Sequence, residues 1–318
     1  MPQKMTNWTP EKKQRLDTFL AEQKAFSSRM KASHAVRKGL VKVNGRIARK
    51  GALVLEPGHQ VEVSESDEPL TEELLKATDL KLEVLYEDDA CMVVSKPAGI
   101  SVHPAPGIPK DAATVLHGAA FLFKKRKIPF SQSAVLVHRL DKETTGCLLL
   151  AKSPAAHLFL QKQFADRTVE KQYLAIVAGI PKPAAAMIDA PIGRHSGDRT
   201  KMAVFHAVSH MREAKTTYRT LGVSKERDAA LLELDLHTGR THQVRVHLKT
   251  IAYPVLGDPS YETRSSIDTA ARYGIDALML HAWKLKFVSP EDEKLHAVSA
   301  PVPMHIQATL KKLGIALP

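Results

Sequence analysis

The stretch VLVHRLDKETTGCLLL, residues 135–150, places a polar segment between two apolar runs. The apolar runs, 135–137 and 147–150, are short, as buried strands are. The segment between them, 138–146, is the densest group of polar side chains in the chain. Loops held by rigid strands often carry catalytic groups, so we expect this loop at a sheet edge, with Asp141 as its functional group. The plainer alternative is that Asp141 only caps a turn.

A second segment, residues 231–248, is expected to bring a cation to a buried helix. Alternating leucines at 232, 234 and 236 predict a strand with one buried face. Thr241 is the predicted N-cap of the helix that follows, in which Arg245 and His242 share one face. An arginine beside a carboxylate keeps it ionised, so Arg245 is a candidate partner for Asp141. A structural ion pair elsewhere is equally compatible with the sequence.

Outside these two segments, short extended patterns alternate irregularly with helices. Ser153-Pro154 predicts an N-cap and the first residue of a helix that runs to about Phe164. Because the order is not a regular strand–helix repeat, we expect an α+β domain over 80–318 with a mixed, mainly antiparallel sheet. The extended segments are predicted at 82–86, 91–95, 147–152, 173–178 and 230–237.

Residues 1–64 predict a separate small α+β domain. Leu16, Phe19 and Leu20 have helical spacing, and a second helix is expected from Ser28 through Val36. Alternation over 40–43 leads into Asn44-Gly45, a strong hairpin signal, and a short strand is expected over 60–63. Residues 65–79 then contain six acidic residues, one lysine and Pro69, which predicts a linker.

The charge distribution points to a polyanionic partner. The chain has 46 Lys and Arg against 34 Asp and Glu, a net charge of +12. Residues 1–64 hold thirteen of the basic and five of the acidic residues, so two thirds of the excess lies in the first fifth of the chain. This is the electrostatic pattern of phosphate binding, although a merely soluble basic surface would share it. Further basic candidates are Lys124-Lys125-Arg126-Lys127, Arg194, Arg199 and Lys201.

Several other classes of protein are disfavoured. Cys91 and Cys147 are too few and too far apart for a disulfide framework or a thiolate metal site. We find no nucleotide-binding glycine fingerprint or phosphate-cradling loop, and we expect neither a metal nor a cofactor. The first residues have no signal-peptide pattern and no run is long enough to span a membrane, so we expect a cytoplasmic protein. A monomer is the default expectation.

The first 64 residues resemble the RNA-binding domain named after ribosomal protein S-four. The likeness lies in Arg15-Leu16-Asp17, Ser28-Arg29, the run GLVKVNG at 39–45 and Pro57-Gly58. The resemblance implies that the second helix faces RNA. Its basic residues would then grip phosphates: Arg29, Lys31, Arg37 and Lys38. A solvated helix face is the alternative.

The rest of the chain resembles the RluA-type pseudouridine synthases. Three segments carry the likeness: HRLD with Thr145-Gly146, KQYLA at 171–175 and GRTHQVRVH at 239–247. Residues 96–99, 102–104, 257–259 and 280–282 also match. The resemblance implies that the protein isomerises uridine to pseudouridine in RNA.

The same resemblance implies roles for individual residues. Asp141 would attack or deprotonate the ribose, so that the uracil detaches, rotates and rejoins through carbon. Arg245 would pair with Asp141, and Tyr173 would stack on the target base. Arg139 would hold the RNA open, and His138, Arg240 and His242 are expected to contact RNA.

Other readings remain open at this point. Large-subunit ribosomal RNA is the expected substrate, with transfer RNA as the alternative. A non-catalytic RNA-binding assembly factor is the main rival from another class. A hydrolase using Asp141 and His138 is a more distant one.

Overall fold

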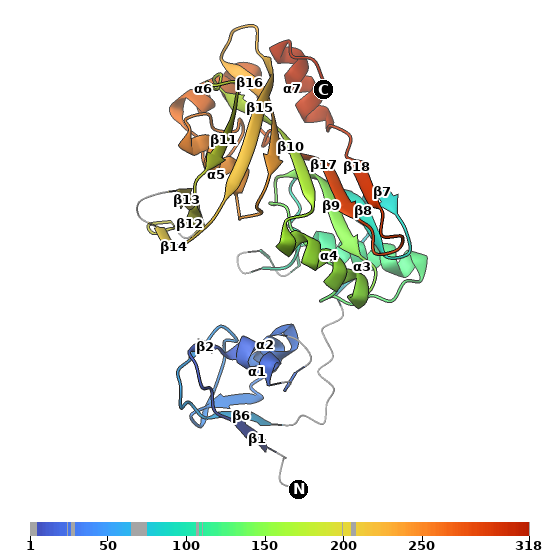
Figure 1. Cartoon of the computed structure of the whole chain (residues 1–318), viewed down its shortest axis with the longest axis vertical. Coiled ribbons are helices and arrows are strands. Elements are labelled where there is room, and N and C mark those ends of the chain that lie inside the picture. Colours follow the sequence, from blue (N-terminus) through green and yellow to red (C-terminus); the bar gives the residue numbers. More distant parts are fainter. Residues whose placement is uncertain are drawn as a thin grey trace. The chain divides into compact units, whose positions relative to one another are not determined.

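The computed structural model describes residues 5–23, 25–26, 29–64, 75–105, 108–109, 111–198, 200–204 and 208–317. The chain divides into two compact units, residues 1–75 and 76–318 (Figure 1). Most of the linker predicted over 65–79 lies outside the described residues, as do Ser28 and Arg199. The domain boundaries expected at 64 and 80 therefore stay predictions.

Unit 1, residues 1–75, packs two short helices, α1 (Leu16–Glu22) and α2 (Arg29–Arg37), with a small sheet. The sheet has the order β1 (Met5–Trp8), β6 (Val61–Ser64), β3 (Val41–Val43) and β4 (Arg46–Ile47). A separate pair joins β2 (Gln14–Arg15) to β5 (Val54–Leu55). Leu16, Phe19 and Leu20 are buried in its core, which confirms the helical spacing. Asn44 and Gly45 have φ of +51° and +73° between β3 and β4, as the hairpin signal predicts.

Unit 2, residues 76–318, is built around a nine-stranded sheet. Of the strand pairs that the described residues form in this sheet, only β17 with β9 is parallel, so the expected mixed, mainly antiparallel sheet is confirmed. The strand order is β11 (Ala185–Asp189), β15 (Lys215–Val223), β16 (Ala229–Leu236), β10 (Glu170–Ala178), β17 (Leu280–Val288), β9 (Thr145–Ala151), β8 (Cys91–Lys96) and β7 (Glu83–Glu87), and β18 (Leu295–Ser299) also pairs with β17.

Helices and a second small sheet flank this large sheet (Figure 1). The helix predicted after Ser153 is present as α4 (Pro154–Asp166), with the Ser153 side chain accepting a hydrogen bond from the Ala156 amide. The other helices are α3 (Val115–Arg126), α5 (Gln243–Thr250), α6 (Arg264–Tyr273) and α7 (Met304–Leu313), and the small sheet has the order β13 (Met202–Val204), β12 (Ile192–His195), β14 (Val208–Arg212).

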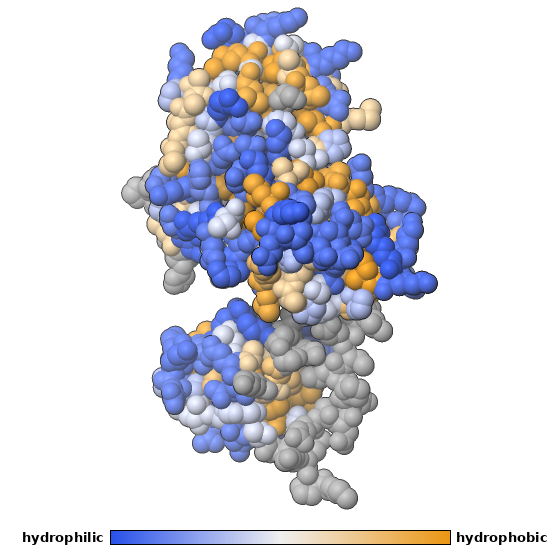
Figure 2. Space-filling model, turned by 45° about the vertical axis from the view of Figure 1, so that its right-hand side comes forward, coloured by the Kyte–Doolittle hydropathy of each residue, from blue (hydrophilic) through white to orange (hydrophobic). Residues whose placement is uncertain are grey.

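Every residue of β9 is buried, so the apolar run at 147–150 forms a central strand of the core. Cys147 contributes to this core, where its thiol donates to the Val298 carbonyl oxygen and burial raises its pKa to about 12. Figure 2 shows that the visible surface is mostly hydrophilic, with apolar residues in separate patches. No helix among the described residues has the length and apolar character needed to cross a membrane.

Gly146 fixes the point at which the polar loop enters the sheet. It lies opposite Ala282 in the parallel pair of β9 with β17, and its φ is +114°. A Cβ at this position would lie 2.1 Å from the Ala282 carbonyl oxygen, so only glycine permits this approach. A β-bulge lies on the other side of β17, where the pairing with β10 shifts register between Gln172 and Tyr173. Bulges re-aim neighbouring side chains.

Candidate active site

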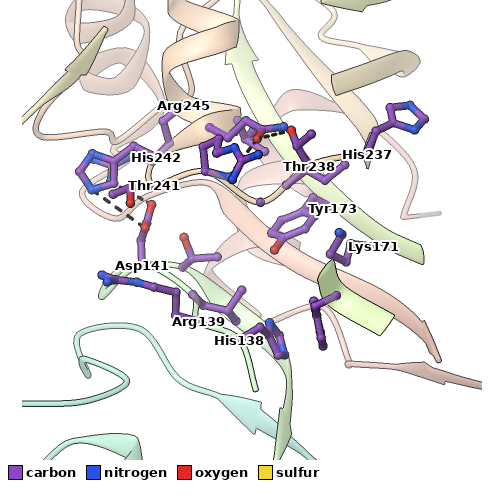
Figure 3. A pocket seen from close by; sticks show the side chains of 18 of the residues that line it. His138, Arg139, Asp141, Lys171, Tyr173, His237, Thr238, Thr241, His242 and Arg245 are labelled. Carbon is purple, nitrogen blue, oxygen red and sulfur yellow. Dashed lines mark hydrogen bonds and ion pairs between the residues drawn. The ribbon is translucent and has the colours of Figure 1, made fainter. Parts of the chain in front are cut away.

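A pocket of about 520 Å³ lies in unit 2 where three segments meet. These segments are the loop that carries Asp141, the start of β10, and the turn between β16 and α5. Figure 3 shows Asp141, Tyr173 and Arg245 pointing toward this common space. The fold therefore brings together the three segments in which chemistry was predicted.

The Asp141 carboxylate is held by an arginine from α5. Arg245 Nη1 lies 3.2 Å from Asp141 Oδ2, although 104 residues separate the two in the chain. Among the described residues no backbone amide donates to the Asp141 side chain, so it does not cap a turn there. Its side chain keeps 17% of its surface exposed, toward the pocket. A ligand in the pocket can therefore reach this carboxylate.

Arg245 is itself anchored by a second carboxylate, Asp258. Arg245 Nε and Nη2 each donate to Asp258 at 2.7 Å. The amides of Ser260 and Tyr261 donate to the same carboxylate, which is fully buried. Burial would lower the pKa of Arg245, but Asp258 and then Asp141 hold it above its ordinary value. A fixed, permanently charged guanidinium thus faces Asp141.

Lys96 braces the loop that carries Asp141. It is fully buried at the end of β8, and its Nζ donates to the carbonyl oxygens of Pro97, Lys142 and Thr144 at 2.7–2.8 Å. Burial lowers the pKa of Lys96 to about 8, against the opposing effect of Glu143 and Asp141. The ammonium therefore ties the end of β8 to the loop that carries Asp141.

His138 has a structural role that differs from the RNA contact predicted for it. Its Nε2 accepts a hydrogen bond of 2.9 Å from the Leu149 amide, and its ring stacks on Phe164 at 4.6 Å between centroids. Burial lowers the pKa of His138 to about 3, so the ring is neutral. The ring also lines the pocket, so the predicted RNA contact of His138 stays a prediction, while its Nε2 is engaged by β9.

Tyr173 and Lys171 enter the pocket from the start of β10 (Figure 3). Burial, and after it the Asp141 carboxylate, raises the pKa of Tyr173, so its hydroxyl stays protonated. Among the described residues this hydroxyl has no hydrogen-bond partner. The Lys171 ammonium lies 5.8 Å from the Phe164 ring centroid, and within the described part of the chain it has no ion-pair partner. Both polar groups are available to a ligand.

Gln243 builds the turn before α5. Its Oε1 accepts from the Thr238 hydroxyl and the Arg240 amide, and its Nε2 donates to the Lys215 carbonyl oxygen and the Thr216 hydroxyl. Because Gln243 satisfies the turn, Thr241 is not the N-cap and that prediction is wrong. The residue before α5 is His242, with a left-handed φ of +56° and no capping bond.

The pocket has a strong excess of positive charge. Among the described residues that line it, Asp141 is the one carboxylate, against six cations. Burial lowers the pKa of Arg240, as do Arg212 and Arg167, which shows how closely like charges gather. The six cations are Arg139, Arg167, Lys171, Arg212, Arg240 and Arg245. An anionic ligand would relieve this repulsion.

In unit 1, the predicted phosphate-binding residues lie on or directly after α2. Arg29, Arg37 and Lys38 are exposed, while the Lys31 side chain lies outside the described residues. Arg29 pairs with the buried Asp17 at 3.5 Å, so part of its charge is used within the domain. Burial would raise the pKa of Asp17, but Arg15 and Arg29 hold it below its ordinary value. In the basic run of unit 2, Arg126 is likewise engaged, by Glu87 at 2.8 Å.

Sequence reasoning missed the supporting residues of this site. Lys96 and Asp258 were noted only within matching segments, and Tyr261 was not noted at all. A signal existed for the first two, since each is a charged residue two positions after an apolar run. Within the described ranges, no three His, Cys, Asp or Glu side chains are grouped so as to hold a metal ion.

The chain is similar to enzymes that modify RNA. The sequence model of the RNA pseudouridylate synthase family matches residues 90–250, and that of the S4 domain matches residues 14–61. The ribosomal large subunit pseudouridine synthase D of Vibrio cholerae is 38% identical over 301 residues, covering 91% of this chain and 88% of that protein. Synthase C of the same organism is 32% identical, with 94% and 93% covered. An uncharacterised RNA pseudouridine synthase of Synechocystis is 35% identical, with 96% and 90% covered.

Solved structures agree on the fold of unit 2. The human RNA pseudouridylate synthase domain containing 4 superposes with a TM-score of 0.58 at 29% identity, covering 74% of this chain and 94% of that chain. The human protein named RNA pseudouridylate synthase domain containing 1 gives 0.59 at 26% identity, with 72% and 87% covered. The expected α+β fold is confirmed.

Proposed function

Because the chain belongs to the RNA pseudouridylate synthase family, we propose that it converts specific uridines of large-subunit ribosomal RNA to pseudouridine, with Asp141 as the catalytic residue. The observation that carries this role is the position of Asp141. In the described part of the chain it is the one carboxylate that lines a cationic pocket, and Arg245 holds it at 3.2 Å. An ionised carboxylate in that setting can act as a nucleophile or as a base.

The reaction is an isomerisation, and each of its steps can be assigned to atoms. The Asp141 carboxylate attacks C1′ of the ribose or removes a proton from the sugar, and the bond between C1′ and N1 of uracil breaks. The uracil then rotates within the pocket, and C1′ bonds to C5 as the bond between Asp141 and C1′ breaks or, on the second route, as the sugar regains its proton. The proton on C5 is lost and N1 ends protonated, so the mass of the RNA does not change.

Tyr173 is proposed to stack on the target base. Its ring lines the same pocket as Asp141, and its protonated hydroxyl has no partner among the described residues, so it can also take part in moving a proton at the sugar. Aromatic side chains are common platforms for bases that have left the stack.

An RNA substrate accounts for the charge of the pocket. A uridine must leave its helix before its glycosidic bond can be reached, at a cost of a few kcal/mol. Contacts between phosphates and the cations around the pocket offset this cost. Arg139, exposed beside Asp141, is proposed to occupy the space that the flipped base leaves, and Arg240 to contact the backbone.

The competing functions have less support. A hydrolase using Asp141 and His138 would need these side chains to cooperate, but His138 Nε2 is bound to the Leu149 amide. A purely RNA-binding assembly factor would not require the chain of Asp258, Arg245 and Asp141, which costs the desolvation of two charges. Ribosomal RNA is favoured over transfer RNA because two relatives of 38% and 32% identity carry the name of large-subunit enzymes.

The test is a map of pseudouridines in ribosomal and transfer RNA from cells that lack the protein. The cells are complemented with the wild type, with Asp141→Asn or with Glu143→Gln, which removes an exposed carboxylate from the same loop. We expect one or a few large-subunit sites to vanish and to return with the wild type and Glu143→Gln only. Sites that return with Asp141→Asn would refute the catalytic role, and lost sites in transfer RNA alone would refute the substrate.

A further inference from the structure

A chain of polar contacts approaches Asp141 from the side opposite Tyr173. The Met202 amide donates to the Tyr261 hydroxyl oxygen at 2.8 Å, and the same oxygen lies 2.8 Å from His242 Nδ1. The other ring nitrogen, His242 Nε2, lies 4.0 Å from Asp141 Oδ1 (Figure 3). Tyr261 is 3% exposed, so this series of polar contacts runs from the protein interior to the pocket.

The hydrogen bond from Met202 to Tyr261 determines which group donates in the contact between Tyr261 and His242. A backbone amide can only donate, so the Tyr261 oxygen accepts from Met202 and has its own proton to give. Burial raises the pKa of Tyr261 to about 12, so that proton is present at neutral pH. If His242 Nδ1–H donated to Tyr261 instead, the tyrosine proton would have no acceptor among the described residues. His242 Nδ1 therefore accepts, and the neutral ring carries its proton on Nε2.

The charges around His242 keep the ring neutral. Burial is the largest cause, and it lowers the pKa of His242. The carboxylates of Asp141 and Asp258 oppose this shift, whereas the charges of Arg245 and Arg139 add to it. These groups come from the Asp141 loop, from α5 and from the segment after α5. The net result is a depressed pKa, so the ring is a neutral donor at the pH of the cell.

The orientation of the ring is also fixed. His242 has a left-handed φ of +56°, which a residue other than glycine rarely adopts unless its surroundings hold it there. Its ring meets the Tyr261 ring edge to face, with centroids 5.6 Å apart. Backbone and side chain together aim Nε2 at the oxygen of Asp141 that Arg245 does not bind.

We propose that His242 is a positioning residue for Asp141, whose Nε2–H, set by Tyr261, donates to Asp141 Oδ1 when the target uridine is bound. The proposal rests on the proposed function. The distance of 4.0 Å is too long for a hydrogen bond in the free protein, and catalytic contacts of this kind often shorten on binding. With Arg245 bound to Oδ2 and His242 bound to Oδ1, the Asp141 carboxylate is held in a single orientation toward the ribose.

Two substitutions separate this role from a structural one. In His242→Gln the side-chain amide can stand where Nε2–H stands, whereas in His242→Asn it stands where Nδ1 stands. We expect His242→Asn to lower the single-turnover rate at saturating RNA at least ten-fold, and His242→Gln to stay within about three-fold of the wild type. Loss of the donor should also move the acid limb of the pH–rate profile of His242→Asn to higher pH. RNA affinity should change less than two-fold in either variant.

A nitrogen NMR spectrum of the histidine rings gives a readout that does not depend on activity. The wild type should show His242 as the neutral ring protonated on Nε2, with the signals assigned by their loss in His242→Gln. A ring protonated on Nδ1 or on both nitrogens would overturn the proposal, as would equal rates and equal pH profiles for His242→Asn and His242→Gln. If the wild type forms no pseudouridine, the proposed function fails while the NMR result still stands.

Discussion

Arg245 donates two hydrogen bonds of 2.7 Å to Asp258 and reaches Asp141 only with its remaining nitrogen. The position of the Asp141 carboxylate, which we propose to be catalytic, is thus set by a residue that is not among the described residues lining the pocket. Arg245 lies between two carboxylates of unequal burial, and the buried one fixes its geometry. This arrangement makes Asp258 a positioning residue for the pair.

Replacing Asp258 should therefore damage both stability and activity. In Asp258→Asn the buried guanidinium loses its charged partner, and breaking such a pair costs about 3–5 kcal/mol. The free Arg245 can then turn toward Asp141, so the single-turnover rate should also fall. Chemical denaturation and a single-turnover assay measure the two effects. The control is Asp268→Asn, which removes the carboxylate of an exposed ion pair with Arg264. An unfolding free energy equal to that of the control would contradict the anchoring role.

Lys96→Met should release the loop that carries Asp141. The variant keeps the bulk of the side chain but leaves the carbonyl oxygens of Pro97, Lys142 and Thr144 without their donor. A buried polar group left unpaired costs about 1–3 kcal/mol. We expect lower stability and a lower rate at saturating RNA, with unchanged RNA affinity. A variant as active as the wild type would show that the loop does not need this brace.

Lys96 should also leave a signature in the pH dependence of stability. Its pKa falls from 10.5 to about 8 on folding because it is buried. Between pH 8 and 10.5 the unfolded chain therefore binds more protons at this site than the folded chain, and the free energy of unfolding rises with pH. The rise is about 3 kcal/mol across the window. Denaturation of the wild type and of Lys96→Met over this range should give curves that differ by this amount, and parallel curves would refute it.

Local patterns were enough to predict most of the fold. The alternation around Leu232 and the cap at Ser153 reflect the burial of one face and a nearby hydrogen bond, and both effects act within a few residues. The pairing of Asp141 with Arg245 was proposed from chemistry and from a resemblance, because its 104-residue separation has no local signature.

The supporting contacts could not be predicted in this way. Asp258 and Tyr261 lie after α5 in a segment that has the polarity of an ordinary loop, and their partners are decided by tertiary packing. The same limit explains the error at Thr241 and the unforeseen hydrogen bond of His138. Each is a polar residue in a matching motif, and only the position of Leu149 or Gln243 in space shows which bonds are already made.

His138 should make the protein sensitive to acid. Its pKa falls from 6.5 to about 3 on folding, mainly because the ring is buried. Below pH 6.5 the unfolded chain takes up a proton that the folded chain refuses, so the free energy of unfolding falls as the pH falls. At pH 4.5 the loss is about 3 kcal/mol. His138→Gln, whose amide oxygen can still accept from Leu149, should lack this part of the acid loss in denaturation curves between pH 7 and 4.5. A variant that loses stability as steeply as the wild type would assign the effect to another group.

Arg37 of unit 1 should contribute to RNA affinity but not to the chemical step. It is exposed on α2, and within the described part of the chain it forms no ion pair. If it contacts a phosphate, Arg37→Gln removes one released counterion, so the slope of log K against log salt should become shallower by about 0.7–0.9. The rate at saturating RNA should not change. Lys311→Gln, which removes the same charge from the exposed side of α7, is the control and should keep the wild-type slope. Equal slopes for both variants would place the RNA away from α2, and a lower rate at saturation would show that unit 1 does more than add affinity.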